Sequence, residues 1–397
     1  MTDLIKSLLA AIISLAAISC SKDEDIAPGN HSRGDLIEAL EKGSLSKAEI
    51  IERVTELDAR GFAEYDVTYE TITYRTLYMG KPIDSRGLLI LPKGAPKVHL
   101  LMYCHGTELP SVRLNVEKIT PSLYDGGTSG FNDVRNMGLG WAAAGYVIFI
   151  PDYIGFGHTL GKDHPYVYFP EMFLSNIDGL LAVKKVMQQK GLDYDNRLFL
   201  AGWSQGAGAA VSAHKYIQEN YADEFTVVAS SGLAGPYNFN RFAESFLERK
   251  NENINALPIF SWGLYSLNKF SALRRPTDQL YSYPVYDQFS SILVPSKKPA
   301  EVFSDYFLKR WADGSDLALK QALAANSFHQ GWKPQGKVFL HHGDADSLVP
   351  EYNTEDAYNG LTAAGGDIKK YIYPGGTHIS ELGNFISNTL TEFNLLR

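Results

Sequence analysis

The apolar residues of this chain gather in short, nearly continuous runs. Five runs have the length and composition of strands buried on both faces. They are residues 98–104, 146–150, 197–201, 225–229 and 337–341. Helical patterns lie between them, most clearly over residues 172–190, where apolar side chains recur on one face. Strands that alternate with helices predict a doubly wound, mostly parallel α/β sheet.

The pattern changes toward the N-terminus. Residues 65–78 alternate aromatic or β-branched residues with polar ones, which is typical of a half-buried antiparallel strand, and residues 87–92 are its expected partner. Residues 44–57 have a helix cap and helical apolar spacing. We therefore expect residues 20–61 to be a tether followed by helices, and residues 62–231 and 333–397 to form the two parts of the α/β core.

Between the last two core strands the alternation stops for residues 232–332. Helical segments are expected at 242–249, 300–311 and 317–325, and Pro258, Pro276 and Pro284 indicate turns. Because this stretch interrupts the core, it predicts a helical cap over the carboxyl edge of the sheet. An independent helical domain is the alternative.

The first residues have the pattern of an export signal. Residues 8–18 are an apolar run of signal-peptide length, too short to span a bilayer, and residues 1–19 would be removed. Ala17-Ile-Ser-Cys20 resembles a bacterial lipobox, which would leave a lipid anchor on Cys20 and an acidic tether after it. The expected location is the outer membrane or cell surface. With a simple signal peptide, the alternative, the protein would be periplasmic or secreted.

Composition narrows the possible partners. With 45% hydrophobic and 21% charged residues the chain is of ordinary globular type, and its net charge of −8 argues against nucleic acid. If Cys20 carries lipid, only Cys104 remains, in an apolar strand where a buried thiol is expected and a cysteine nucleophile is the alternative. No metal-ligand spacing, phosphate cradle or dinucleotide fingerprint occurs, so we expect no metal and no cofactor.

One apolar strand runs directly into Gly202-Trp-Ser-Gln-Gly206. This pattern predicts a sharp turn from strand to helix that exposes the Ser204 hydroxyl above the sheet. The flanking glycines fit such a turn, since a Cβ there would collide with the neighbouring strand or helix. The motif alone is short enough to arise by chance, so its surroundings decide.

A serine nucleophile needs a base and an acid that orients the base. Asp346 follows the strand at 337–341, and His378 follows the final short strand. Ser204, Asp346 and His378 would therefore meet at the carboxyl edge of the sheet, where open α/β sheets bind their ligands. Asp344, two residues before Asp346, is the alternative acid.

An oxyanion in this arrangement is held by backbone amides. The first expected donor is the N–H of Gln205, directly after the nucleophile, and the second is the N–H of Thr107 or, failing that, Gly106. His105 is expected to brace that loop.

Substrate-pocket candidates are Asp152, Tyr153 and Trp203, which lie in or beside loops at the same edge. For Asp152, a turn or cap role is the alternative.

Five segments together resemble the α/β-hydrolase superfamily, and most nearly its secretory lipase family. They are residues 103–107, 140–157, 202–206, 342–346 and 376–378. The resemblance covers residue 65 to the C-terminus and implies an α/β-hydrolase fold and a serine hydrolase of carboxylic esters. In that role Ser204 would be the nucleophile, His378 the base and Asp346 its orienter. Some secretory lipases carry an acidic side chain where this chain has His105-Gly-Thr107, a departure that argues against true long-chain lipase activity.

The expected function is that of an exported carboxylic ester hydrolase whose substrate is a small or polysaccharide-linked ester and whose contact with a membrane is the lipid anchor. A serine peptidase of prolyl-peptidase type is one alternative, although residues 21–61 leave no room for a propeller domain. A non-catalytic surface binding protein on a hydrolase scaffold is the other.

Overall fold

The computed structural model describes residues 31–56, 60–110 and 120–397. Contacts divide the chain into Met1–His31 and Ser32–Arg397, and the second unit holds the fold. The expected signal peptide and Cys20 lie outside the described residues.

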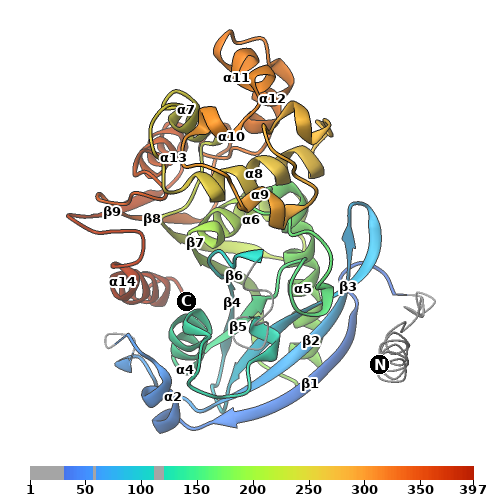
Figure 1. Ribbon diagram of the computed structural model, residues 1–397. Coiled ribbons are helices and arrows are strands. Elements are labelled where there is room, and N and C mark those ends of the chain that lie inside the picture. Colours follow the sequence, from blue (N-terminus) through green and yellow to red (C-terminus); the bar gives the residue numbers. More distant parts are fainter. Residues whose placement is uncertain (1–30, 57–59, 111–119) are drawn as a thin grey trace, which may run out of the picture. The chain divides into compact units, whose positions relative to one another are not determined.

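A nine-stranded sheet forms the centre of this unit, in the order β1-β2-β3-β5-β4-β6-β7-β8-β9 (Figure 1). The first three strands join β5 in antiparallel pairs, and every pair from β5 to β9 is parallel. The strands are β1 (Leu36–Leu45), β2 (Val67–Tyr78), β3 (Lys81–Pro92), β4 (Val98–Cys104), β5 (Tyr146–Pro151), β6 (Tyr194–Trp203), β7 (Thr226–Leu233), β8 (Lys337–Gly343) and β9 (Ile368–Tyr373). The mostly parallel doubly wound sheet is therefore confirmed.

Helices cover both faces of the sheet. On one face pack α5 (Phe169–Gln189), α6 (Gln205–Asn220) and α13 (Tyr352–Ala363), and on the other α2 (Lys47–Arg53), α4 (Gly140–Ala143) and α14 (Leu382–Asn394). In β4, Leu100 and Met102 join the first core and Leu101 and Tyr103 the second. This period of two explains why the central strands are continuously apolar.

The N-terminal expectation was partly wrong. Leu36–Leu45 forms strand β1, an edge strand paired with β2, instead of tether or helix. Its outward side is exposed and polar, so its composition is that of a surface helix, and pairing with β2 overrides that propensity. The helix that follows begins at Ser46, whose side chain and Glu49 form a capping box. The α/β core therefore begins before residue 62.

Residues between β7 and β8 form the helical insertion. Its helices are α7 (Phe239–Leu247), α8 (Leu257–Phe270), α9 (Gln288–Ile292), α10 (Pro299–Val302), α11 (Asp305–Ala312) and α12 (Leu317–Ala325). Figure 1 shows them gathered beyond the carboxyl ends of β6, β7 and β8. Pro258 was expected in a turn but lies in the first turn of α8, where its missing N–H costs no helical hydrogen bond.

Candidate active site

Ser204 is the single residue between the end of β6 and the start of α6. Its backbone has φ 56° and ψ −123°, a conformation that residues other than glycine rarely adopt. Its N–H donates to the carbonyl oxygen of Leu233 at the end of β7 over 2.8 Å. The turn thus presents the serine hydroxyl beyond the carboxyl edge of the sheet.

The two motif glycines make this turn possible. A Cβ on Gly202 would lie 2.1 Å from the carbonyl oxygen of Gly206, and one on Gly206 would lie 1.9 Å from that of Cys104. Both obstacles are backbone atoms, which cannot rotate away. The predicted steric role of the glycines therefore has a direct basis in the structure.

The three candidate catalytic side chains form one hydrogen-bonded chain. His378 Nε2 lies 2.9 Å from Ser204 Oγ, and His378 Nδ1 lies 2.7 Å from Asp346 Oδ2. Because a carboxylate oxygen can only accept from Nδ1–H, Nε2 is left to accept the serine proton. The indole N–H of Trp203 donates to the carbonyl oxygen of His378 over 2.9 Å and holds the histidine loop against the elbow.

Asp346 is held as an anion. Burial alone would raise the pKa of its carboxyl, but hydrogen bonds from His342 and His378 outweigh burial and keep this pKa well below its usual range. The N–H groups of Leu348 and Val349 donate to its other oxygen over 2.8 and 3.0 Å. Such a carboxylate stays charged and can orient and stabilise a protonated imidazole.

Asp344, the alternative acid, points elsewhere. It is exposed and accepts a hydrogen bond from Gly375 N–H over 2.6 Å. The structure therefore brings Asp346 rather than Asp344 to His378.

Two of the three candidate oxyanion donors have free amides. Among the described residues, the N–H groups of Gln205 and Thr107 donate to no other group. The N–H of Gly106 instead donates to Asp133 Oδ2 over 3.1 Å, and the Tyr103 hydroxyl donates to the same oxygen over 2.9 Å. Gly106 is thereby engaged in fixing the loop, which leaves Thr107 as the second candidate donor.

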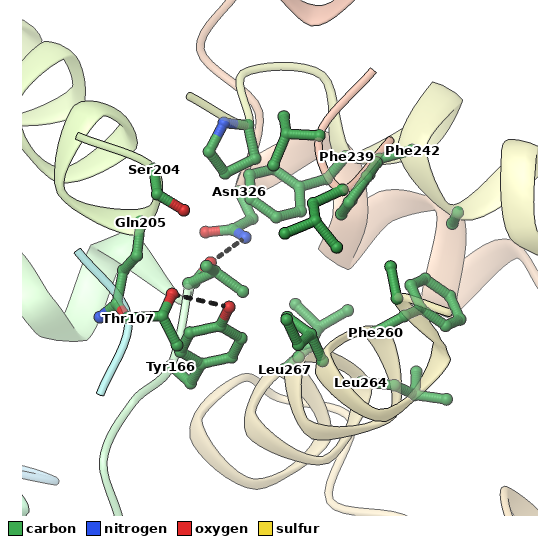
Figure 2. Close-up of a pocket in the computed structure, with 18 of the residues that line it drawn as sticks. Thr107, Tyr166, Ser204, Gln205, Phe239, Phe242, Phe260, Leu264, Leu267 and Asn326 are labelled. Carbon is green, nitrogen blue, oxygen red and sulfur yellow. Dashed lines mark hydrogen bonds between the residues drawn. The ribbon is translucent and has the colours of Figure 1, made fainter. Parts of the chain in front are cut away.

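A cavity of about 310 Å³ opens directly on Ser204. Figure 2 shows the serine hydroxyl directed into it, with Phe239, Phe242, Phe260, Leu264 and Leu267 of the insertion around the opposite walls. The polar lining atoms are largely paired within the protein: Thr107 Oγ1 with the Tyr166 hydroxyl at 3.1 Å, and Asn326 Nδ2 with the carbonyl oxygen of Val167 at 2.8 Å. The cavity is therefore suited to an apolar ligand.

Two of the three pocket candidates lie outside this cavity. Asp152 is buried and accepts hydrogen bonds from the N–H and the hydroxyl of Ser122. Burial raises its pKa to about 6. Tyr153 is also buried, and its hydroxyl donates to the carbonyl oxygen of His105 over 3.0 Å. Trp203 does line the cavity.

His105 and Cys104 lie beneath the oxyanion loop. His105 Nδ1 is 2.9 Å from the carbonyl oxygen of Gly106, its ring stacks on Tyr153, and burial lowers its pKa to about 4. These contacts join His105 to the loop and to Tyr153. Burial raises the pKa of the Cys104 thiol to about 12, which leaves it a poor nucleophile.

Sequence reasoning missed two residues beside the site. His164 and Tyr166, in the connection between β5 and α5, contact Gln205 and Thr107 respectively. Nothing in the local sequence indicates this, because the contacts join segments far apart in the chain.

In residues 31–56, 60–110 and 120–397, no three His, Cys, Asp or Glu side chains are arranged to hold a metal ion. Among the helices of these same residues, none is both long and apolar enough to cross a bilayer.

No family model and no curated protein sequence matches the chain. Solved structures do. The esterase LipA of Xanthomonas oryzae, described as degrading rice cell walls, superposes with a TM-score of 0.76 and 21% identity over 92% of this chain and 100% of its own. An inferred hydrolase from Legionella pneumophila gives a TM-score of 0.76 and 19% identity over 91% of this chain and 98% of its own.

Candida antarctica lipase A in its closed state is a more distant match, with a TM-score of 0.63 and 17% identity over 91% of this chain and 83% of its own. At such identities the likeness concerns the arrangement of the backbone. The central sheet, the helices on both faces and the strand-to-helix turn at Ser204 are consistent with this likeness. The chain thus has the α/β-hydrolase fold.

Proposed function

We propose that this protein is a serine hydrolase that cleaves carboxylic esters with an apolar acyl group. The observation that carries the proposal is the position of His378, hydrogen-bonded to both Ser204 and Asp346 at the mouth of an apolar cavity. The structural likeness to an esterase and a lipase supports the same reaction class.

In this reaction Ser204 Oγ attacks the ester carbonyl carbon while His378 Nε2 takes its proton. The N–H groups of Gln205 and Thr107 stabilise the oxyanion of the tetrahedral intermediate. His378 then gives the proton to the leaving alcohol, which leaves an acyl group on Ser204. Water, activated by the same histidine, hydrolyses this acyl-enzyme, and Asp346 stabilises the imidazolium in both steps.

The cavity favours an ester substrate over a peptide. A peptidase holds the substrate backbone through unpaired polar groups, whereas here the Thr107 and Tyr166 hydroxyls are bonded to each other and the Asn326 amide to the carbonyl oxygen of Val167. Burial of each additional acyl methylene contributes about 0.8 kcal/mol, or roughly four-fold in kcat/KM, until the cavity is filled.

The test uses p-nitrophenyl esters from acetate to palmitate, together with methyl ferulate. We expect kcat/KM to rise with chain length until the cavity is filled, and Ser204→Ala to abolish hydrolysis of every ester. A fluorophosphonate probe should label the wild type but not this variant. Retained hydrolysis in Ser204→Ala would contradict the mechanism, and failure to label the wild type would favour a binding protein.

We further propose that the protein is exported and anchored through lipid on Cys20, as residues 17–20 suggest. Labelled palmitate should be incorporated into the wild type and not into Cys20→Ala. Incorporation into both proteins, or into neither, would contradict the anchor.

A further inference from the structure

The connection between β5 and α5 contacts the residues of both proposed oxyanion donors. Tyr166 reaches Thr107 through its hydroxyl, and His164 reaches Gln205 through its imidazole. The two donors follow different strands, and no hydrogen bond joins them in the part of the chain that the structure describes. A single short segment therefore touches both halves of the site.

The protonation of His164 follows from its partners. Its Nδ1 lies 2.8 Å from the carbonyl oxygen of Ile154, which can only accept, so Nδ1 carries a hydrogen. In a neutral imidazole Nε2 is then an acceptor, and the Gln205 amide, whose Nε2 lies 2.5 Å away, donates to it. This bond fixes the side chain of the residue whose backbone N–H faces the oxyanion.

The Tyr166 hydroxyl contacts the residue of the other proposed donor, Thr107. It lies 3.1 Å from Thr107 Oγ1, and in Figure 2 this bond runs along the cavity wall beside Ser204. Asp133 also fixes the loop that carries Thr107, because it accepts a hydrogen bond from the N–H of Gly106, the residue before Thr107. Together with the contact of His105 Nδ1 with the Gly106 carbonyl oxygen, the bond from Tyr166 restrains the loop at Thr107.

The same segment is packed against the insertion. The rings of Tyr166 and Trp262, on α8, stack with centroids 3.8 Å apart and planes 4° from parallel. His164 N–H donates to Gln288 Oε1 on α9 over 2.9 Å. Asp163, just before it, accepts from the Tyr265 hydroxyl of α8 over 2.7 Å. The segment is thus held by the insertion on one side and holds the donor residues on the other.

We propose that His164 and Tyr166 are positioning residues that set the two oxyanion donors, and that α8 and α9 hold them in place. This inference rests on the proposed function. Neither residue exchanges a proton with substrate. Their loss should weaken binding of the transition state without weakening binding of the ground state.

The first test is Tyr166→Phe, which keeps the stack on Trp262 and removes only the hydroxyl. We expect kcat for a p-nitrophenyl ester to fall about ten-fold with KM nearly unchanged, less than the loss of a donor itself. The matched control is Tyr281→Phe, which removes a buried hydroxyl that belongs to the insertion and is bonded to the carbonyl oxygen of Ser261 at 2.8 Å. Its kcat should stay within about two-fold of the wild type, since Tyr281 does not line the cavity.

The second test compares two replacements of His164. Glutamine can present its amide oxygen near the position of imidazole Nε2 and so keep an acceptor for Gln205, whereas the shorter asparagine cannot reach it. We expect His164→Asn to lower kcat about ten-fold and His164→Gln to recover most of it. Gln205→Met, which keeps the backbone donor, should match His164→Asn, and the double variant should be no worse than either.

A trifluoromethyl ketone, which forms a tetrahedral oxyanion on serine, gives an independent readout. Its Ki should rise in Tyr166→Phe and His164→Asn by the factor lost from kcat, while the Kd of the product acid stays constant. An unchanged kcat and Ki in both variants, with melting temperatures equal to the wild type, would overturn the inference. If the wild type itself hydrolyses no ester and resists fluorophosphonate, the proposed function fails instead.

Discussion

His378 Nδ1 lies 2.7 Å from Asp346 Oδ2, whereas Asp344, two residues earlier, accepts from the Gly375 N–H. Asp346→Asn should lower kcat roughly 10⁴-fold, because an amide no longer favours the tautomer in which Nε2 accepts the serine proton. Asp344→Asn is the matched control and should keep kcat within about two-fold. Steady-state kinetics on a p-nitrophenyl ester measure both, and equal losses in the two variants would contradict the assignment.

Gly206 should be the least replaceable glycine of the elbow. In Gly206→Ala the new Cβ would lie 1.9 Å from the carbonyl oxygen of Cys104 and 2.5 Å from that of His105, so β4 would have to move. We expect a loss of about 3 kcal/mol in the free energy of unfolding, measured in urea. In Gly263→Ala, on α8, the nearest atom is 3.3 Å away, and stability should change by less than about 1 kcal/mol. Equal stability of the two variants would show that the elbow can relax.

Gly263 should also determine how long an acyl chain the cavity accepts. It lines the cavity, and the nearest atom to a Cβ there is Val167 Cγ2, the far end of a side chain. Gly263→Phe should fill the space and lower kcat/KM for palmitate esters by about ten-fold or more. Acetate esters should be hydrolysed at the wild-type rate, which provides the internal control. An equal decrease for both esters would indicate damage to the site instead of a shortened pocket.

Asp152 should give the protein a measurable dependence of stability on pH. Burial raises its pKa to about 6 in the folded state, above the ordinary value in the unfolded chain. The folded state therefore binds more protons between pH 4 and 6, and stability falls as the pH rises through this window. Relative to Asp152→Asn, which does not titrate, the wild type should lose roughly 2 kcal/mol from pH 4 to pH 6 in urea unfolding. A constant difference between the two proteins would contradict the raised pKa.

Much of the core could be predicted because local pattern and tertiary structure agree there. The apolar runs are buried on both faces, and Ser204, Asp346 and His378 lie just beyond strand ends, where the order of the strands brings them together. Strand β1 could not be predicted in the same way, because its pairing with β2 outweighs a helix-forming composition. Helix α8 could not be predicted from the sequence, because Pro258 is equally compatible with a turn and with the first turn of a helix.

The second group of site residues has no local signature at all. His164 lies 41 positions from Gln205, and Tyr166 lies 59 from Thr107, so only the folded chain brings them into contact. The walls of the cavity are unpredictable for a similar reason. Phe239, Phe260 and Leu323 come from three helices whose mutual packing is set by side-chain shape rather than by sequence period.

Ser204 N–H bonds to Leu233, the residue at which the chain leaves β7 for the insertion. Parallel neighbours such as β7 and β8 need a long crossover connection between them. In this protein the crossover is the insertion, and its helices form much of the wall of the cavity. The reacting side chains and most of the cavity walls therefore lie in different stretches of the sequence, which are joined by the contacts of His164 and Tyr166 with α8 and α9. Exchange of residues 234–336 between proteins of this architecture offers a way to change the accepted ester, provided that the contacts of the insertion with His164 and Tyr166 are kept.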